Sequence, residues 1–202
     1  QEHKTTIEKI ISEIFKVSFV HRFRDIDEHV RSNSIYYLSQ WFKAWPEHFY
    51  QVTYLKYFGW LLNDENVQVR NQVLSSLAEL VKFSNSRNSL SIENDCFRQF
   101  FERFQDKIKQ ITCIDSSYDC RMHAIKVLTQ INHMDYLEES DRLAMSSLLF
   151  KIDSTDEKFS TSTSKESRFY SAVAKMFYDS ECFTELQIPL KKTKTKSKTK
   201  NN

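Results

Sequence analysis

Glycine and proline are almost absent from this sequence. One glycine (Gly59) and two prolines (Pro46 and Pro189) occur in 202 residues. A protein built from strands needs such residues at its many turns, so their scarcity favours an all-helical fold. Phosphate-binding loops of the Walker or dinucleotide type need two or three glycines close together, because only glycine lets the backbone approach the phosphates. This chain cannot form such a loop.

Cysteine and histidine occur without the spacing that metal or redox chemistry needs. The four cysteines form no C-x-x-C pair, the six histidines form no H-E-x-x-H motif, and no serine or cysteine nucleophile motif is present. Reduced core thiols of a nuclear or cytosolic protein are the simpler interpretation of the cysteines. We therefore expect no metal, no cofactor and no catalytic residue, and a binding module rather than an enzyme.

The chain also lacks an apolar run long enough to cross a membrane, and it shows no secretory signal. Its formal net charge is +2, but residues 191–202 carry six lysines and no acid. Removing those six charges leaves the rest of the chain at −4, so bulk charge does not indicate a domain that coats duplex DNA. A first residue of Gln1 rather than Met suggests a segment of a longer protein.

An internal repeat is the strongest positive signal. Three segments place an acidic or polar turn before an arginine near the start of a helix, at residues 25–31, 64–70 and 117–121. Arg31 and Arg70 are 39 residues apart, and Arg70 and Arg121 are 51 apart. These periods suit a two-helix repeat of the HEAT type. We assign Arg31 and Arg70 to repeat architecture, and we assign the turn carboxylates to helix capping rather than to acid–base catalysis.

The predicted fold is an all-α, HEAT-repeat-like solenoid of about four antiparallel helix pairs over residues 1–189. Apolar residues recur at helical spacing in each second helix, as in Ile35, Leu38 and Phe42. The ends of such a segment should expose apolar faces that further repeats would cover. The first helices of the pairs are expected near 5–23, 50–62 and 94–113, with a fourth pair near 137–150 and 165–178. Residues 190–202 form a Lys/Thr-rich tail that is expected to be disordered.

Several ordered motifs resemble the stromalin conservative domain of the cohesin stromal-antigen subunit family, over about residues 15–130. They are Ser18–Asp25 (SFVHRFRD), Ser39–Trp41, Thr53–Trp60 (TYLKYFGW) followed by LLND, Val69–Arg70, Arg103–Ile108 (RFQDKI) and, more loosely, Asp119 with Ala124–Leu128. Two positions depart from the family pattern. Ser39 stands where a glycine is usual, and Val52 where animal members commonly carry an acid. These departures resemble those of a fungal member.

The resemblance implies a non-enzymatic scaffold of the ring complex that entraps chromosomes, located in the nucleus on chromosomes. Family members bind the kleisin subunit and DNA. They also bind regulators with a short aromatic-x-Phe motif, such as shugoshin and, in animals, an insulator protein. By residue-to-residue match, the implied peptide-binding surface consists of Arg24, Tyr54, Lys56, Tyr57, Trp60, Arg103 and Phe104.

Helical spacing agrees with a surface at this place. Lys56, Tyr57 and Trp60 fall on one face of their helix, and Leu55, Phe58 and Leu62 fall on another that suits the core. We expect the first set to form an exposed aromatic and cationic stripe, of the kind that dominates interface hot spots. Packing between repeats is the alternative for Trp60 and for Phe104. Gly59 would permit a close approach of a neighbouring helix or of a ligand backbone.

Basic residues leave further alternatives open. Arg22 and Arg24 would either contact phosphates or pair with Asp25 and Asp27. The candidate nucleic-acid contacts are Arg22, Lys191, Lys192, Lys194 and Lys196. The lysine tail would serve either as a solubilising linker or in nuclear import or DNA contact. Three functions therefore compete: a docking module of cohesin, a DNA-gripping segment of the same subunit, and a generic HEAT adaptor of unrelated role.

Overall fold

The structure is a computed structural model that describes residues 2–86, 91–142, 168–169 and 171–175. Within these residues the chain forms helices and no strands. The elements are α1 (Glu2–Ile14), the π-helical segment η1 (Phe15–Phe19), α2 (Val20–Arg22), α3 (Glu28–Ala44), α4 (Pro46–Phe49), α5 (Val52–Leu61), α6 (Val67–Ser86), α7 (Ser91–Ile114) and α8 (Tyr118–His133).

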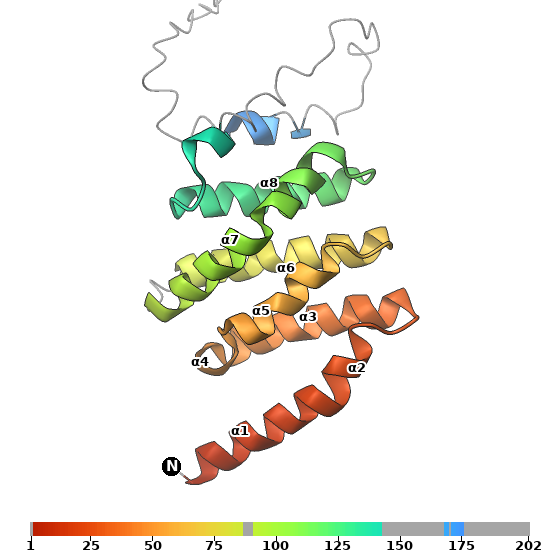
Figure 1. The fold of residues 1–202 in the computed structure, drawn as a ribbon, viewed down its shortest axis with the longest axis vertical. Coiled ribbons are helices and arrows are strands. Elements are labelled where there is room, and N and C mark those ends of the chain that lie inside the picture. Colours follow the sequence, from red (N-terminus) through yellow and green to blue (C-terminus); the bar gives the residue numbers. More distant parts are fainter. Residues whose placement is uncertain (1, 87–90, 143–167, 170, 176–202) are drawn as a thin grey trace, which may run out of the picture.

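The helices stack in the order of the sequence (Figure 1). The first pair consists of α3 and the continuous helical run formed by α1, η1 and α2. The next two pairs are α5 with α6 and α7 with α8. α3, α6 and α8 form one layer of the stack, with α5 and α7 in the other. This arrangement confirms the predicted all-α solenoid. The predicted fourth pair lies largely outside the described residues, and the Lys/Thr tail lies wholly outside them.

Local sequence explains where the second helices begin. Asp27 caps α3 by accepting a hydrogen bond from the His29 backbone N–H at 2.7 Å, and Ser117 caps α8 by accepting one from the Cys120 N–H at 3.3 Å. Pro46 occupies the first turn of α4, where its missing N–H costs no helical hydrogen bond. The prediction that turn residues cap helices is confirmed for Asp27.

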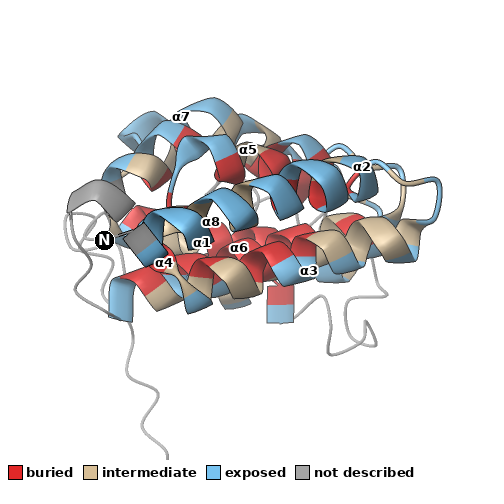
Figure 2. Ribbon diagram, turned by 90° about the horizontal axis from the view of Figure 1, so that it is seen from below, coloured by how far each residue is buried: buried red, intermediate tan, exposed pale blue. Residues whose placement is uncertain are grey.

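The core lies between the two layers, on the facing sides of the helices (Figure 2). It combines aliphatic with aromatic side chains, and many of the 16 phenylalanines of this sequence are buried there. The largest fully buried side chains include Phe42, Phe58, Phe97, Phe100 and Phe101. None of the helices within the described residues is long and apolar enough to cross a membrane.

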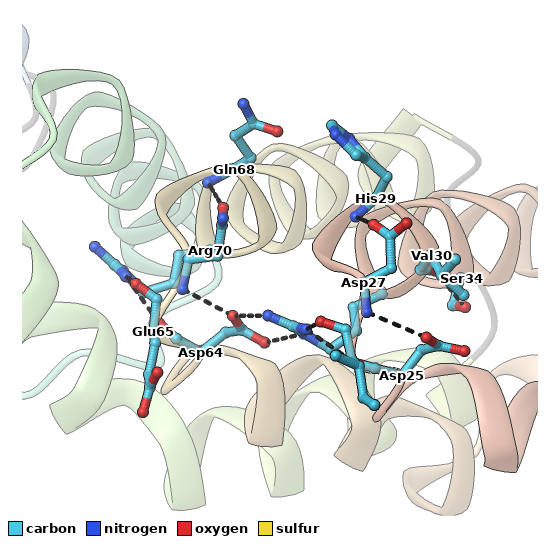
Figure 3. A network of polar contacts seen from close by, with 12 residues as sticks. Asp25, Asp27, His29, Val30, Ser34, Asp64, Glu65, Gln68 and Arg70 are labelled. Carbon is cyan, nitrogen blue, oxygen red and sulfur yellow. Dashed lines mark hydrogen bonds and ion pairs between the residues drawn. The ribbon is translucent and has the colours of Figure 1, made fainter.

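Two arginines link successive repeats, and we call this arrangement the Asp–Arg ladder. Figure 3 shows the part of the ladder around Asp64. Arg31 donates from Nε and Nη2 to the carboxylate of Asp64, at 2.7 and 2.8 Å. Arg70 repeats the contact with Asp115, at 2.8 and 3.1 Å. In each case Nη1 donates to two carbonyl oxygens in the turn before the arginine's own helix. Arg31 and Arg70 are therefore architectural, as their repeated position predicted.

The ladder should make stability fall in acid. Burial by itself would raise the pKa values of Asp64 and Asp115, but hydrogen bonds from the arginines and from backbone N–H groups outweigh it and hold both below the ordinary aspartate value. A carboxyl whose pKa is lower in the folded state than in the unfolded state stabilises the fold fully at pH values above the unfolded-state pKa, about 3.9. This stabilisation is lost as the pH falls from there through the folded-state pKa. We expect urea midpoints to fall below about pH 4.

A variant with Asp64→Asn and Asp115→Asn isolates the ladder's share of this effect. It should start from a lower stability at pH 7 and show a shallower decline in urea midpoint between pH 5 and pH 2. An equally steep decline in the variant would assign the acid sensitivity to other carboxylates.

The first helical run, α1 with η1, leaves several apolar side chains exposed. Ile7, Ile10, Ile14 and Val17 are at least half exposed and recur at three- and four-residue spacing. This confirms the expectation that an end of the repeat stack exposes an apolar face.

Candidate docking surface

The helix run from α1 to α2 meets α5 through two matched rows of aromatic rings. Phe15, Phe19 and Phe23 are four residues apart, and Tyr54, Tyr57 and Trp60 are three apart. The Tyr57 ring lies within 4.8 to 5.4 Å of all three phenylalanine rings, and the Trp60 ring stacks on Phe23 at 6.0 Å. The five-residue π-helical segment (15–19) has a wider turn, which keeps residues four apart on the face toward α5.

This covering by the first helix corrects one prediction. Tyr57 is 6% exposed and Tyr54 is 8% exposed, so neither belongs to an exposed stripe. The helical spacing correctly placed Tyr57 on the face of α5 opposite the core face that contains Phe58. That opposite face, however, is covered by the helical run that contains η1 and α2. Burial raises the pKa of both phenols. The Tyr54 hydroxyl lies 3.1 Å from Nε2 of His48 on α4, so its polar end does not meet Trp60.

Trp60, by contrast, keeps 38% of its surface exposed. Arg24 lies 5.6 Å from the centre of the Trp60 ring and 5.0 Å from that of Phe23. The ammonium group of Lys56 lies 5.2 Å from the same Trp60 ring and equally far from Tyr57. We call these five residues, Phe23, Arg24, Lys56, Tyr57 and Trp60, the Trp60 cluster. It combines a partly exposed indole with two cations, one from the turn after α2 and one from α5.

Helix α7 extends the cluster on its other side. The ring of Phe104 packs against Gly59 so closely that a side-chain Cβ at position 59 would overlap it. Gly59 thus permits the approach of a neighbouring helix, which was one of its two predicted roles. Phe104 is half-buried, and the Arg103 guanidinium lies 5.3 Å from the Phe104 ring centre. Phe104 therefore contacts the residue that precedes Trp60, and Arg103 lies against Phe104.

The cations of this surface are available to a ligand. Within the described residues, no ion pair engages Arg24, Lys56 or Arg103. Guanidinium and ammonium groups beside an aromatic ring can bind a carboxylate or a backbone carbonyl while the ring accepts an apolar or aromatic group. The arrangement has the chemistry of a peptide-docking surface, and no cluster of metal-binding side chains occurs in the described part of the chain.

Arg22 is the one predicted nucleic-acid contact that falls within the described residues, and it is not part of the Trp60 cluster. Arg22 pairs with Asp25 at 2.9 Å, which is one of the two alternatives raised for it, and it lines a separate hollow of about 380 Å³ beside Tyr37 and Trp41. Arg24 forms no ion pair with Asp25 or Asp27 within the described residues, and its guanidinium lies over the rings of Phe23 and Trp60. The four tail lysines lie outside the described residues.

Two contributors were missing from the predicted surface. Phe23 supports one side of the Trp60 ring, and Phe19 helps to cover Tyr57. One signal in the sequence could have indicated this aromatic contact. It is the four-residue spacing of Phe15, Phe19 and Phe23 together with the three-residue spacing of the aromatic residues on α5.

The fold and this surface together define a helical-repeat scaffold that presents a partly exposed aromatic and cationic patch. Residues 24–105 match the family model described as "Stromalin conservative domain", inside the region expected from the motifs. The chain belongs to the cohesin stromal-antigen, or stromalin, subunit family.

Individual relatives agree with that assignment. The chain is 45% identical over 176 residues to cohesin subunit SCC3 of Saccharomyces cerevisiae, covering 87% of this chain and 15% of that protein. It is 35% identical to cohesin subunit SA-1 of Xenopus laevis over 66% of this chain and 10% of that protein. The structure of cohesin subunit Scc3 from Z. rouxii superposes with a TM-score of 0.73 at 39% identity, covering 92% of this chain and 20% of that one. The greater identity to the budding-yeast protein than to the frog protein fits the expected fungal origin.

Proposed function

We propose that this chain is a non-enzymatic scaffold segment of a cohesin subunit, acting in the nucleus on chromosomes. It docks kleisin and short aromatic-x-Phe regulatory peptides, of the shugoshin kind, to support sister-chromatid cohesion and chromosome segregation. The chain spans only 15% of the budding-yeast relative, so this role concerns one segment of a longer assembly. The single observation that carries the proposal is Trp60, 38% exposed between the cations of Arg24 and Lys56.

The physical argument follows from these contacts. An aromatic side chain of a peptide can stack on the free part of the Trp60 ring, which Phe23 and Tyr57 hold from behind. Arg24, Lys56 and Arg103 can then bind acidic neighbours or carbonyl groups of the peptide. Rigid aromatic anchors flanked by arginine are typical hot spots, and truncating one costs about 2 kcal/mol or more.

Fluorescence anisotropy of a labelled Tyr-Glu-Phe peptide, with and without a kleisin segment, tests the proposal. Trp60→Ala should weaken saturable binding about 30-fold, which corresponds to about 2 kcal/mol. Tyr37→Ala is the matched control, because Tyr37 is a 59% exposed aromatic residue on α3 outside the Trp60 cluster. Binding that is absent with and without kleisin, or equal in the two variants, would rule out this docking site.

A second candidate function is supported by the opposite layer of helices. Lys82, Lys126 and Lys175 line a surface hollow of about 500 Å³ beside α6 and α8. No ion pair engages these three lysines within the described residues, and the acid in the same lining, Glu79, pairs with Lys43 at 2.6 Å. Such a local basic patch could contact DNA phosphates although the chain outside its lysine tail is acidic overall.

Filter binding to duplex DNA separates the two basic regions. If the α6/α8 patch grips DNA, Lys82→Glu with Lys126→Glu should abolish most binding and flatten its salt dependence. Deleting residues 190–202 tests the lysine tail in the same way. If both variants bind DNA with unchanged affinity, the proposal that this segment grips DNA through either basic region is ruled out.

A further inference from the structure

We infer that Arg31 is a positioning residue for the Trp60 cluster, because it fixes the gap between the two chain segments that form it. This inference goes beyond the family's docking role and rests on the proposed function only for its effect on peptide binding. One segment carries Phe23 and Arg24, and the other carries Trp60. Arg31 itself belongs to neither segment.

The first segment is the turn after α2. The N–H of Asp25 closes this turn on the Arg22 carbonyl at 3.1 Å. Arg31 Nη1 donates to the carbonyl oxygens of Asp25 and Ile26, at 2.8 and 3.0 Å. These carbonyls immediately follow Arg24, so the contact limits where the backbone of Phe23 and Arg24 can lie relative to α3.

The second segment is the end of α5, which carries Trp60, with the turn that follows it. The Asn63 N–H bonds to the Trp60 carbonyl at 3.3 Å, and the Asp64 N–H bonds to the Leu61 carbonyl at 3.1 Å. Arg31 Nε and Nη2 hold the Asp64 carboxylate at 2.7 and 2.8 Å. One guanidinium therefore contacts both turns at once, with the Arg31 side chain 16% exposed and that of Asp64 7% exposed.

The planar fork of arginine is what makes this bridge rigid. A lysine keeps the charge but offers a single ammonium group, which cannot bind the carboxylate in bidentate fashion and also reach two carbonyls on the other side. Arg31→Lys should thus loosen the spacing between Arg24 and Trp60 without removing any side chain of the Trp60 cluster.

Asp115→Asn is the matched control, because it disrupts the other rung of the Asp–Arg ladder. That rung joins Arg70 to the turn after α7, and Asp115 makes none of the contacts that form the Trp60 cluster. Arg70 Nη1 also bonds to the Asp64 and Glu65 carbonyls of the turn after α5, but Asp115 takes no part in these bonds, which Asp115→Asn leaves in place. A merely structural role for Arg31 predicts that Arg31→Lys and Asp115→Asn act alike on the cluster.

The first test needs no ligand. The chain contains three tryptophans, so 5-fluorotryptophan labelling gives three ¹⁹F resonances, and Trp60→Phe identifies that of Trp60. Arg31→Lys and Asp64→Asn should each shift the Trp60 resonance and increase its solvent isotope effect, whereas Asp115→Asn should leave it in place. A Trp60 resonance that is unchanged in the folded Arg31→Lys or Asp64→Asn variant overturns the inference. If the Arg31→Lys variant does not fold, the Trp60 resonance of the Asp64→Asn variant alone tests the inference.

The second test is a double-mutant cycle on peptide affinity with the labelled Tyr-Glu-Phe peptide. Arg24→Ala should weaken binding about three- to fivefold in the wild-type background, but less than about twofold in Arg31→Lys. Additive effects would contradict positioning by Arg31. If the peptide does not bind wild type at all, the docking proposal fails, and the ¹⁹F measurement alone decides the role of Arg31.

Discussion

Asp115→Ala should lower the free energy of unfolding by about 3 kcal/mol or more. Asp115 has a side chain only 5% exposed, and it accepts two hydrogen bonds from Arg70 and a third from the Ser117 N–H at 2.8 Å. Its removal leaves the Arg70 guanidinium, 13% exposed, without its carboxylate. An uncompensated charge in such a site costs far more than the net value of the pair.

Urea unfolding of this chain checks the prediction against a matched pair. Lys43 and Glu79 form an ion pair at 2.6 Å between α3 and α6, but Glu79 is 62% exposed. Glu79→Ala should therefore cost less than about 1 kcal/mol. Adding Arg70→Met to Asp115→Ala should recover part of the loss, since it removes the unpaired charge. Equal losses for Asp115→Ala and Glu79→Ala would contradict the structural role given to the ladder.

Phe58→Ala should be the other strongly destabilising change, with a loss of about 4 kcal/mol. Phe58 is fully buried on α5 and meets the Phe42 ring of α3 edge-on, with ring centres 5.9 Å apart. Truncation leaves a cavity between the layers in addition to the lost transfer free energy. Because Phe58 lies two residues from Trp60, repacking around that cavity should also disturb the Trp60 cluster.

Tyr37→Ala again provides the comparison, because it removes an aromatic ring that is 59% exposed. Urea unfolding should show a change of less than about 0.5 kcal/mol in its free energy of unfolding. Thermal unfolding followed by circular dichroism would give the same ranking. A Phe58→Ala variant as stable as Tyr37→Ala would show that α5 does not pack against α3 as described.

The repeat architecture could be predicted well from the sequence because its signals are local. The recurring arginines gave the period, and the spacing of Ile35, Leu38 and Phe42 gave the buried face of one helix. The aspartate partners of Arg31 and Arg70 could not be predicted from the sequence in the same way. Each arginine bonds to an aspartate 33 or 45 residues further along the chain, and helical periodicity carries no information on that pairing.

The candidate surface could be predicted only in part for a related reason. Spacing on α5 shows which residues share a face, but not whether another helix covers it. Tyr57 is covered by Phe15, Phe19 and Phe23, whereas Trp60, one turn further on, extends past the end of α2 and stays partly exposed. The difference depends on where α2 ends, and this is a tertiary feature.

Photo-crosslinking would test the docking site most directly. The probe is the Tyr-Glu-Phe peptide with benzoylphenylalanine in place of its phenylalanine, bound to this chain in the presence of a kleisin segment and mapped by mass spectrometry. We predict crosslinks in residues 56–60, at residues 23–24 and at residues 103–104, competed away by unlabelled peptide. Crosslinks confined to α6 and α8, or equally abundant in Trp60→Ala, would contradict a docking site at Trp60.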